Sequence, residues 1–375
     1  MCQAISGVAV LANETITVYT SDKTDSHTEI REEFNIRDDY GPGATRQTPI
    51  ELIPISGLTD ISGMEFRFDD CRPGWWTDAM TDEAIRQLFQ AWRSRWNGNV
   101  LCFPSTLQLN SVTVIPEGTT FKAHNLYLDS VTVIPEGTTF DVDGDLYLNS
   151  VTVIPEGTTF KARTLHLHSV TVIPEGTTFD VDGDLYLNSV TVIPEGMTFK
   201  AHNLYLDSVT VIPEGMTFKA RTLYLNGVTA IPEGTTFDVD GDLYLNGVTA
   251  IPEGTTFDVD GDLYLNSVTV IPEGTTFKAH NLYLNSVTVI PEGTAFDVDG
   301  TLHLNSVTVI PEGTTFDVDG DLYLNSVTAI PEWMTFKART LHLNSVTVIP
   351  EGVTARAKRV FFKNDNQSTD FWKLN

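Results

Sequence analysis

Basic residues are scarce in this chain of 375 residues. It has 23 Lys and Arg against 50 Asp and Glu, which gives a formal net charge of -27 although only 19% of its residues are charged. A chain with this balance could not neutralise a phosphate backbone over any length, so we expect no direct binding to nucleic acid. The same balance argues against docking on an anionic membrane surface.

Cysteines and long apolar runs are also rare. The three cysteines, Cys2, Cys71 and Cys102, are too few for a disulfide framework. One disulfide and a fully reduced interior suit that count equally well. No apolar run has the length of a transmembrane helix, and no basic residue precedes the short apolar stretch at the N-terminus, so we expect no signal peptide. We expect a soluble, cytoplasmic protein.

An internal repeat occupies most of the chain. The string Val-Thr-Val/Ala-Ile-Pro-Glu occurs thirteen times, from Val112 to Val346, at spacings of 19 or 20 residues. The spacing depends on the segment that follows the Phe of each repeat, which we name the connector. A basic connector, such as Lys-Ala-His-Asn at residues 122–125, is one residue shorter than an acidic one, such as Asp-Val-Asp-Gly-Asp at residues 141–145.

Three short strand-like runs in each repeat predict an all-β fold, a parallel β-solenoid (β-helix) of about 12 coils. The runs are Leu-Tyr-Leu-Asn, Ser-Val-Thr-Val-Ile, and Thr-Thr-Phe with the first connector residues. Pro116-Glu117-Gly118 predicts a corner, because Pro donates no ladder hydrogen bond and Gly allows a positive φ. Coils would stack at about 4.8 Å to form a rod. A leucine-rich horseshoe has repeats of similar size, but these runs leave little room for its helix.

The repeat divides the chain into three parts. We expect a small α+β head at residues 1–100, the solenoid at residues 101–352 and a short C-terminal cap at residues 353–375. The head should contain strands at residues 5–11 and 15–19 and helices at residues 26–34 and 81–96, the second helix with Thr81 as its N-cap. The apolar stripe of that helix is Ile85, Leu88, Phe89 and Trp92. The residues expected inside the first coil are Val112, Ile115, Phe121, Leu126 and Leu128.

The blocks that repeat are similar to those of a known group of proteins. Residues 146–152 (Leu-Tyr-Leu-Asn-Ser-Val-Thr) and 154–157 (Ile-Pro-Glu-Gly) resemble uncharacterised repeat proteins of bacteriophages and bacteria, in which LYLxSVTxLPEG units recur about every twenty residues. The resemblance covers residues 101–352, and Met1 to Ser6 resembles the head of some members. It implies the solenoid fold and a phage or bacterial source, and it brings no catalytic residues.

We expect no metal site, and the acidic connectors supply the calcium candidates that the sequence offers. Their Asp-Val-Asp-Gly-Asp pattern is similar to the start of a calcium loop, but the glutamate that completes such a loop is missing. The alternative is a solvated Asp-Gly turn. Stacked acidic connectors give the best calcium candidates, which are Asp238, Asp240, Asp258 and Asp260. Where a basic connector neighbours an acidic one, Lys and Asp should pair across strands.

A line of glutamates, one at each corner, is the most regular charged feature. We name them the corner glutamates. At about 4.8 Å spacing they could imitate a nucleic-acid backbone and occupy a DNA-binding protein, or they could keep the rod soluble. The corner glutamates that we select as partner-binding candidates are Glu117, Glu136, Glu156, Glu175, Glu195, Glu214, Glu233 and Glu253.

Two further ranks should line the surface. Ser111 and Thr113 should point outward with their counterparts, Thr132 and Thr152 among them, and flat Ser/Thr arrays resemble the face of ice-binding proteins. Strand propensity alone would also select these threonines. Aromatic residues should form an outward ladder that could bind sugars or a partner chain, with Tyr127, Tyr147 and Tyr186 as the candidates. The histidines are too scattered to make a zinc site.

No catalytic constellation is visible. The chain has no phosphate-binding glycine loop and no nucleophile elbow, and Cys2 lacks the glycine that follows the N-terminal nucleophile of amidotransferases. We therefore expect a protein that is not an enzyme and has no cofactor. It should be a structural or interaction protein that presents periodic surfaces to a protein partner, with an acidic DNA mimic as the first alternative and an ice-binding protein as the second. The sequence leaves the oligomeric state open.

Overall fold

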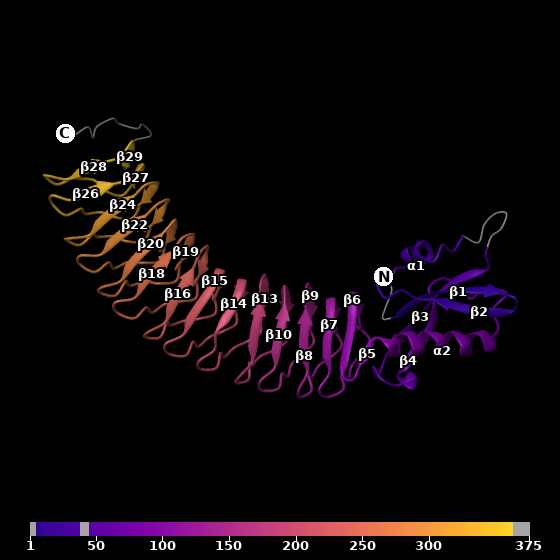
Figure 1. Ribbon diagram of the computed structural model, residues 1–375. Helices are drawn as coiled ribbons and strands as arrows, with labels where there is room; N and C mark the ends of the chain where they lie inside the picture. The colour runs from indigo at the N-terminus through magenta and orange to yellow at the C-terminus, as the bar shows by residue number, and fades with distance from the viewer. Residues whose placement is uncertain (1–4, 38–44, 363–375) are drawn as a thin grey trace. The chain divides into compact units, whose positions relative to one another are not determined.

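The computed structural model describes residues 5–37 and 45–362 and is mostly β-structure (Figure 1). It contains two α-helices, a small antiparallel sheet near the N-terminus and a parallel β-solenoid of about 14 turns, which confirms the predicted fold class. The chain divides into two compact units, Met1–Tyr186 and Leu187–Asn375. The first holds the head and the first coils, and the second holds the later coils. Neither helix is long and apolar enough to cross a membrane.

The head is built on a four-stranded antiparallel sheet in the order β2-β1-β3-β4. Two of its strands match the predicted ones, and β3, which is buried along its whole length, and β4 were not predicted. Gly7 allows helix α2 to approach the sheet, because a Cβ there would lie 3.0 Å from Leu88 Cδ2. The elements of the head are β1 (Ile5–Ala12), β2 (Thr15–Tyr19), α1 (His27–Glu33), β3 (Gln47–Pro54), the 3-10 turn η1 (Ile61–Gly63), β4 (Met64–Phe68) and α2 (Asp78–Ser94).

Helix α1 is confirmed, but the prediction for α2 was wrong in its boundaries. The Ser26 side chain accepts the Glu29 amide and begins α1 as predicted. Helix α2 begins at Asp78 with Thr77 as its N-cap, about one turn before Thr81, because the Thr77 hydroxyl accepts the Met80 amide. Its buried stripe is Ala84, Leu88 and Trp92, while Ile85 and Phe89 are only partly covered.

The solenoid begins with a turn that precedes the first repeat. Strand β5 (Trp96–Asn97) pairs antiparallel with β6 (Val100–Gln108), and β6 pairs in parallel with β7. This turn, with another after the last repeat, accounts for about 14 turns where about 12 were predicted. The remaining strands of the first unit are β7 (Thr120–Tyr127), β8 (Thr139–Val142), β9 (Asp145–Tyr147), β10 (Thr159–Ala162), β11 (Thr164–His166), β12 (Thr178–Val181) and β13 (Asp184–Tyr186).

The second unit continues the same pattern of parallel strands. Phe pairs with Phe, Leu with Leu and Tyr with Tyr or His in successive coils, so the register follows the repeat. Its strands are β14 (Phe199–Tyr205), β15 (Thr217–Tyr224), β16 (Thr236–Val239), β17 (Leu243–Tyr244), β18 (Thr256–Val259), β19 (Asp262–Tyr264), β20 (Thr276–Ala279), β21 (Asn281–Tyr283), β22 (Ala295–Val298), β23 (Leu302–His303), β24 (Thr315–Val318), β25 (Asp321–Tyr323), β26 (Thr335–Lys337), β27 (Thr340–Leu343), β28 (Thr354–Arg356) and β29 (Arg359–Phe362).

One of the three predicted strands per coil is wrong. The Ser-Val-Thr-Val-Ile run is not a strand, and it pairs between coils only through single bridges such as Val133 with Val153. A turn closed by the bond from the Val131 amide to the Leu128 carbonyl bends the chain just before this run. Pro135 follows it and cannot donate to a ladder. In each coil, therefore, at most one residue between this turn and the proline corner pairs with the neighbouring coil.

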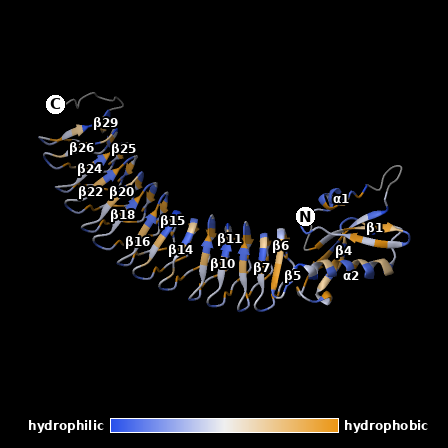
Figure 2. Ribbon diagram, in the orientation of Figure 1, coloured by the Kyte–Doolittle hydropathy of each residue, from blue (hydrophilic) through white to orange (hydrophobic). Residues whose placement is uncertain are grey.

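The core of each coil is the predicted set of apolar residues, which recur along the coils in Figure 2. Val112, Phe121, Leu126 and Leu128 are fully buried, and Ile115 is nearly so. The Phe rings stack in parallel from coil to coil, for example Phe121 on Phe140 with centroids 5.6 Å apart. The corner glycines have a positive φ, such as +72° at Gly254, which explains the Pro-Glu-Gly corner.

Candidate functional site

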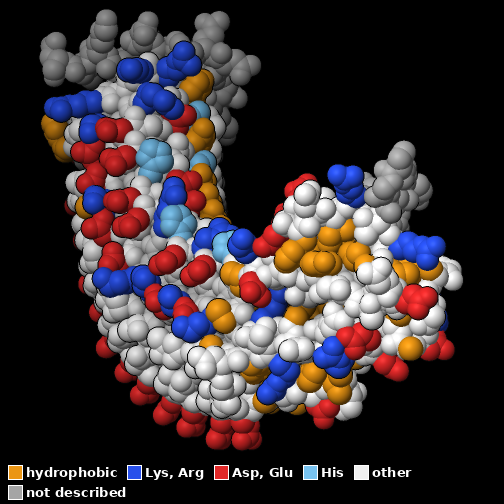
Figure 3. Space-filling model, turned by 45° about the vertical axis from the view of Figure 1, so that its right-hand side comes forward, with side chains coloured by type: hydrophobic (Ala, Val, Ile, Leu, Met, Phe, Trp, Pro, Cys, Tyr) orange, Lys and Arg blue, Asp and Glu red, His pale blue; other side chains and the backbone are white. Residues whose placement is uncertain are grey.

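The corner glutamates lie in an unbroken exposed line within each unit. Backbone bonds hold neighbouring corners together, for example from the Gly118 amide to the Glu136 carbonyl at 2.9 Å. Among the described residues no corner glutamate forms an ion pair. Figure 3 shows a line of acidic side chains without basic neighbours along an edge of the coils. The structure therefore brings these predicted residues together as a column of uncompensated negative charge. The predicted members are Glu117, Glu136, Glu156 and Glu175 in the first unit and Glu195, Glu214, Glu233 and Glu253 in the second.

A rank of exposed valines was not predicted. Each of these valines lies two residues before a corner proline and three residues before a corner glutamate. These side chains are 48–72% exposed, although valine is usually buried. The signal was present in the sequence: Val112 and Ile115 both point inward, so the two residues between them must face solvent. We name this set the valine rank; its members are Val114, Val133, Val153, Val172, Val192, Val211, Val270, Val289, Val309 and Val348.

The predicted threonine rank lies beside the valine rank. Thr113, Thr132 and Thr152 are exposed, as predicted. Several of their hydroxyls donate to a backbone carbonyl of the preceding coil, as Thr152 Oγ1 does to the Thr132 carbonyl at 3.2 Å. Serines of the neighbouring rank do the same, as Ser169 Oγ does to the Asn149 carbonyl at 2.5 Å. Many hydroxyls in these ranks are therefore used for bonds between coils.

The aromatic residues form a ladder of stacked rings, as predicted. Tyr127 stacks on Tyr147 with centroids 4.4 Å apart, and His166 lies between Tyr147 and Tyr186. The rings are half-buried, and burial lowers the pKa of the His166 imidazole. In the second unit burial, with the nearby Asp242 charge, raises the pKa of Tyr244 to about 12. These shifts favour neutral rings, so the ladder is an apolar stack with polar edges.

The connectors neutralise one another. Lys161 Nζ lies 2.7 Å from Asp141 Oδ1, and this hydrogen bond lowers the pKa of the Asp141 carboxyl. In the second unit Lys337 pairs with Asp317. Acidic and basic side chains are interspersed over these coils in Figure 3.

The four calcium candidates do not converge on one point. Asp238 and Asp258 are register partners, but Asp238 pairs with Lys219 at 2.9 Å and Asp258 with Lys278 at 2.8 Å. Asp240 and Asp260 are exposed. Within residues 5–37 and 45–362, none of these four belongs to a group of three or more metal-ligating side chains that lie close together.

The head contains buried polar groups that no sequence pattern indicated. Arg95, which follows α2, is 8% exposed, donates to the Ser21 carbonyl at 2.7 Å and lies over the Phe103 ring at 4.0 Å. Its Nε and Nη1 atoms have no hydrogen-bond partner. Burial raises the pKa of Asp25 to about 8, although the charge of Arg95 opposes the shift. Asp25 and Ser105 help to line a cleft of about 520 Å³ between the head and β6.

Cys71 and Cys102 are exposed and free, and Cys2 lies outside the described residues.

The fold and its surfaces define a parallel β-solenoid protein with a small antiparallel-sheet head. No protein-family model, curated protein or solved structure matches the chain. The resemblance to phage and bacterial repeat proteins therefore stays a prediction.

Proposed function

We propose that this chain is a non-catalytic binding protein whose solenoid engages a basic protein partner. The observation that carries the proposal is the exposed valine rank beside the corner glutamates. The contact surface consists of these two rows and the threonine rank, within either unit. The head would cap the first coils and add specificity.

An apolar strip edged by polar groups has the usual anatomy of a protein interface. Exposed apolar patches are rare on soluble proteins unless they contact a partner, and interfaces have an apolar centre with a polar rim. Here the valine rank is the centre, with threonine hydroxyls on one side and corner glutamates on the other. A partner that covers the valines would place its own lysines or arginines against the glutamates.

The regular spacing suits a partner that contacts several coils. Each coil contributes one carboxylate, and most coils contribute one valine, at about 4.8 Å from the next coil. Many weak contacts then add along the solenoid, and charge attraction raises the rate of encounter. Binding should accordingly weaken as the salt concentration rises.

The second candidate is a DNA mimic, which is favoured because the corner glutamates form no ion pair with any residue that the structure describes. A mimic needs the carboxylates but makes no use of the valine rank. Ice binding, the other alternative, would need free Ser/Thr hydroxyls, and many of those are used for bonds between coils. The valines therefore separate the first candidate from the second.

The test compares capture of proteins from a bacterial lysate by the full-length chain and three sets of variants. The first set changes Glu233, Glu253, Glu273 and Glu292 to Gln. The second changes Val211, Val270, Val289 and Val309 to Ser. The control set changes the exposed connector residues Asp240, Asp260, Asp299 and Asp319 to Asn, which removes the same charge as the first set.

We expect one or more basic proteins to be retained by the wild type and the control set and lost with both the Glu and the Val sets. Loss with the Glu set alone, together with displacement of the captured protein by duplex DNA, would support mimicry instead. Equal capture by all four proteins would rule out a role for this surface.

A further inference from the structure

Three potential metal ligands meet in the head. His27 begins α1, Glu51 lies in the middle of β3 and Asp69 directly follows β4. His27 and Glu51 are each 7% exposed, while about half of the Asp69 side chain faces solvent. One ligand atom from each residue lies within 4.8 Å of the other two, and no second group of this kind occurs in the described part of the chain.

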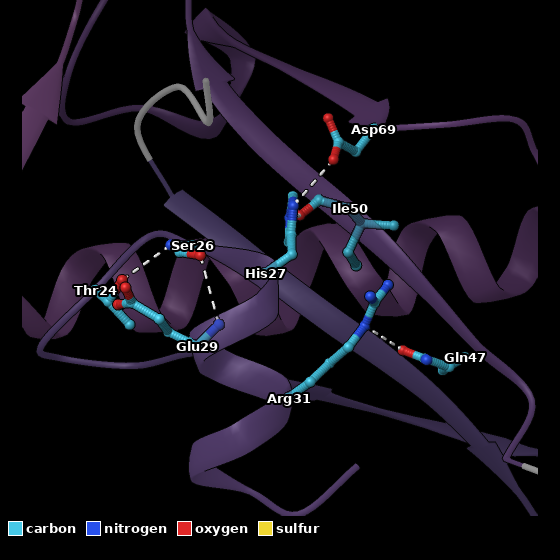
Figure 4. Close-up of polar contacts among 8 residues, drawn as sticks. All are labelled: Thr24, Ser26, His27, Glu29, Arg31, Gln47, Ile50 and Asp69. Carbon is cyan, nitrogen blue, oxygen red and sulfur yellow. Dashed lines mark hydrogen bonds and ion pairs between the residues drawn. The ribbon is translucent and has the colours of Figure 1, made fainter. Parts of the chain in front are cut away.

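The surroundings of His27 fix the direction of its ring. Its Nε2 atom lies 3.3 Å from the Ile50 carbonyl oxygen, and its Nδ1 atom lies 3.1 Å from Asp69 Oδ2 (Figure 4). In the neutral ring a proton on Nε2 is donated to the carbonyl, which leaves the lone pair of Nδ1 facing a carboxylate. A cation between Nδ1 and Asp69 turns this repulsive arrangement into two ligand bonds.

The same arrangement is common around bound metals. A histidine ligand usually donates its other N–H to a carbonyl or carboxylate, which fixes the tautomer and the orientation of the ring. Here the Ile50 carbonyl takes that role. The ring is therefore held by a second contact before any ion arrives.

We propose that His27 Nδ1, Glu51 and Asp69 bind one divalent transition-metal ion of the zinc class. Zinc bonds to nitrogen and oxygen ligands at about 2.0–2.2 Å, which places tetrahedral ligand atoms about 3.4 Å apart. The Nδ1–Asp69 distance already fits this, and Glu51 needs only a small side-chain movement. The imidazole ligand argues against calcium and magnesium, which prefer oxygen alone.

The charges of the proposed ligands fit a divalent ion, because the two carboxylates of Glu51 and Asp69 balance a doubly charged ion. Arg67, the register partner of Glu51, directs its guanidinium to Glu65, to which it donates two hydrogen bonds at 2.8 and 3.1 Å. The half-exposed Asp69 gives the ion an entry path and leaves room for a water ligand.

An ion at this position would join three elements that are far apart in the sequence. It would tie the short helix α1 to strand β3 and to the end of β4, because each element supplies one ligand. The site is independent of the binding surface proposed for the solenoid.

The test uses the full-length chain after treatment with a chelator and dialysis. Binding of Zn²⁺ is measured by calorimetry, and Co²⁺ is used as a spectroscopic probe because its visible absorption reports coordination. We expect one ion per chain. His27→Ala and Asp69→Ala should each weaken binding at least about 100-fold, since even indirect partners of metal ligands are worth 10–100-fold. His124→Ala, which removes an exposed histidine of the solenoid, is the matched control and should bind as the wild type does.

Three results would overturn the proposal. The first is a wild-type chain that binds neither ion at one per chain, which would mean that His27 and Asp69 form only an ion pair. The second is binding that survives both ligand substitutions. The third is binding that is lost in the His124→Ala control. Asp69→Ala changes a half-exposed side chain, so it keeps the test valid if His27→Ala disrupts the fold of the head.

Discussion

Trp333 occupies the one corner of the second unit where glycine is replaced, and it offers the sharpest test of how the corners are built. Its φ is +61°, close to the +69° to +79° of the corner glycines in the same unit. A bulky residue in this left-handed region is strained, because its Cβ crowds the following carbonyl. The side chain is 70% exposed, and its ring lies against Gly352, where an added Cβ would be 2.3 Å from Trp333 Cε3.

Two substitutions at Trp333 separate strain from packing. Trp333→Ala and Trp333→Gly both remove the ring and its contact with Gly352, but only glycine relieves the strained φ. The left-handed region costs a non-glycine residue about 1–2 kcal/mol, and glycine loses about 0.5–1 kcal/mol more backbone entropy than alanine on folding. The Gly variant should therefore be more stable than the Ala variant by roughly 0.5–1 kcal/mol.

The assay is hydrogen exchange of the amides that join the last coils. The Thr354 amide donates to the Met334 carbonyl at 2.8 Å, and the Ala338 amide donates to the Arg356 carbonyl at 3.2 Å. Stability differences in solenoids are local, so these amides report the corner better than a global melt does. We expect about two- to fivefold slower exchange in Trp333→Gly than in Trp333→Ala.

The same pair of substitutions at Thr335 is the control. Thr335 is an exposed residue of β26 without a positive φ, so alanine there should be the more stable of the two by about 0.5–1 kcal/mol. Equal exchange for the two Trp333 variants, or the order found at Thr335, would refute the idea that backbone strain governs residue choice at the corners.

Two further predictions concern the interior and the ring ladder. Phe257 is fully buried between Phe237 and Phe277, so Phe257→Ala should lower the local free energy of unfolding by about 3–5 kcal/mol, measured by hydrogen exchange of the β18 amides. The control, Thr256→Ala on the exposed face, should lower it by under about 0.5 kcal/mol, and similar values for both variants would contradict the stacking argument. Burial lowers the pKa of His303 in the ladder, so as the pH falls the unfolded chain takes up a proton at this histidine before the folded chain does. The neutral ring therefore contributes to the free energy of unfolding above pH 6.5, and this contribution is lost as the pH falls through the pKa of the folded state. His303→Tyr should therefore reduce the fall in urea midpoint between pH 7.5 and pH 5, and an unchanged fall would refute it.

The repeat made the solenoid predictable because one pattern was sampled thirteen times. The Pro-Glu-Gly corner between Val112 and Phe121 is visible in the sequence, and the burial of Val112, Phe121 and Leu126 is confirmed. The error lay in the Ser-Val-Thr-Val-Ile run, whose β-branched residues favour a strand. The turn before the run and the proline after it outweigh the strand propensity of these residues, so only a single bridge forms between neighbouring coils.

The head was harder to predict, since no segment of it repeats. His27, Glu51 and Asp69 are separated by 24 and 18 residues, and only the pairing of β3 with β4 and the packing of α1 on the sheet bring them near one another. Strand β3 has no alternation of polar and apolar residues, because both of its faces are covered. A cluster that depends on such a strand leaves no spacing signal in the sequence.

The position of the acidity in the structure supports our proposal that it serves recognition and not solubility alone. Residues 111–352 hold 32 acids against 9 bases, and connector aspartates pair with lysines at several places where an acidic connector adjoins a basic one. Within the described part of the chain, the corner glutamates have no such partners. Solubility would explain a column of free carboxylates, but it would not explain an exposed valine rank beside it, which lowers solubility. Strand propensity does not explain the valines either, because residues at this position pair between coils only through single bridges, and alanine takes the same position at Ala230, Ala250 and Ala329 without a break in the coils. A partner that covers the valines and pairs with the glutamates accounts for both rows at once.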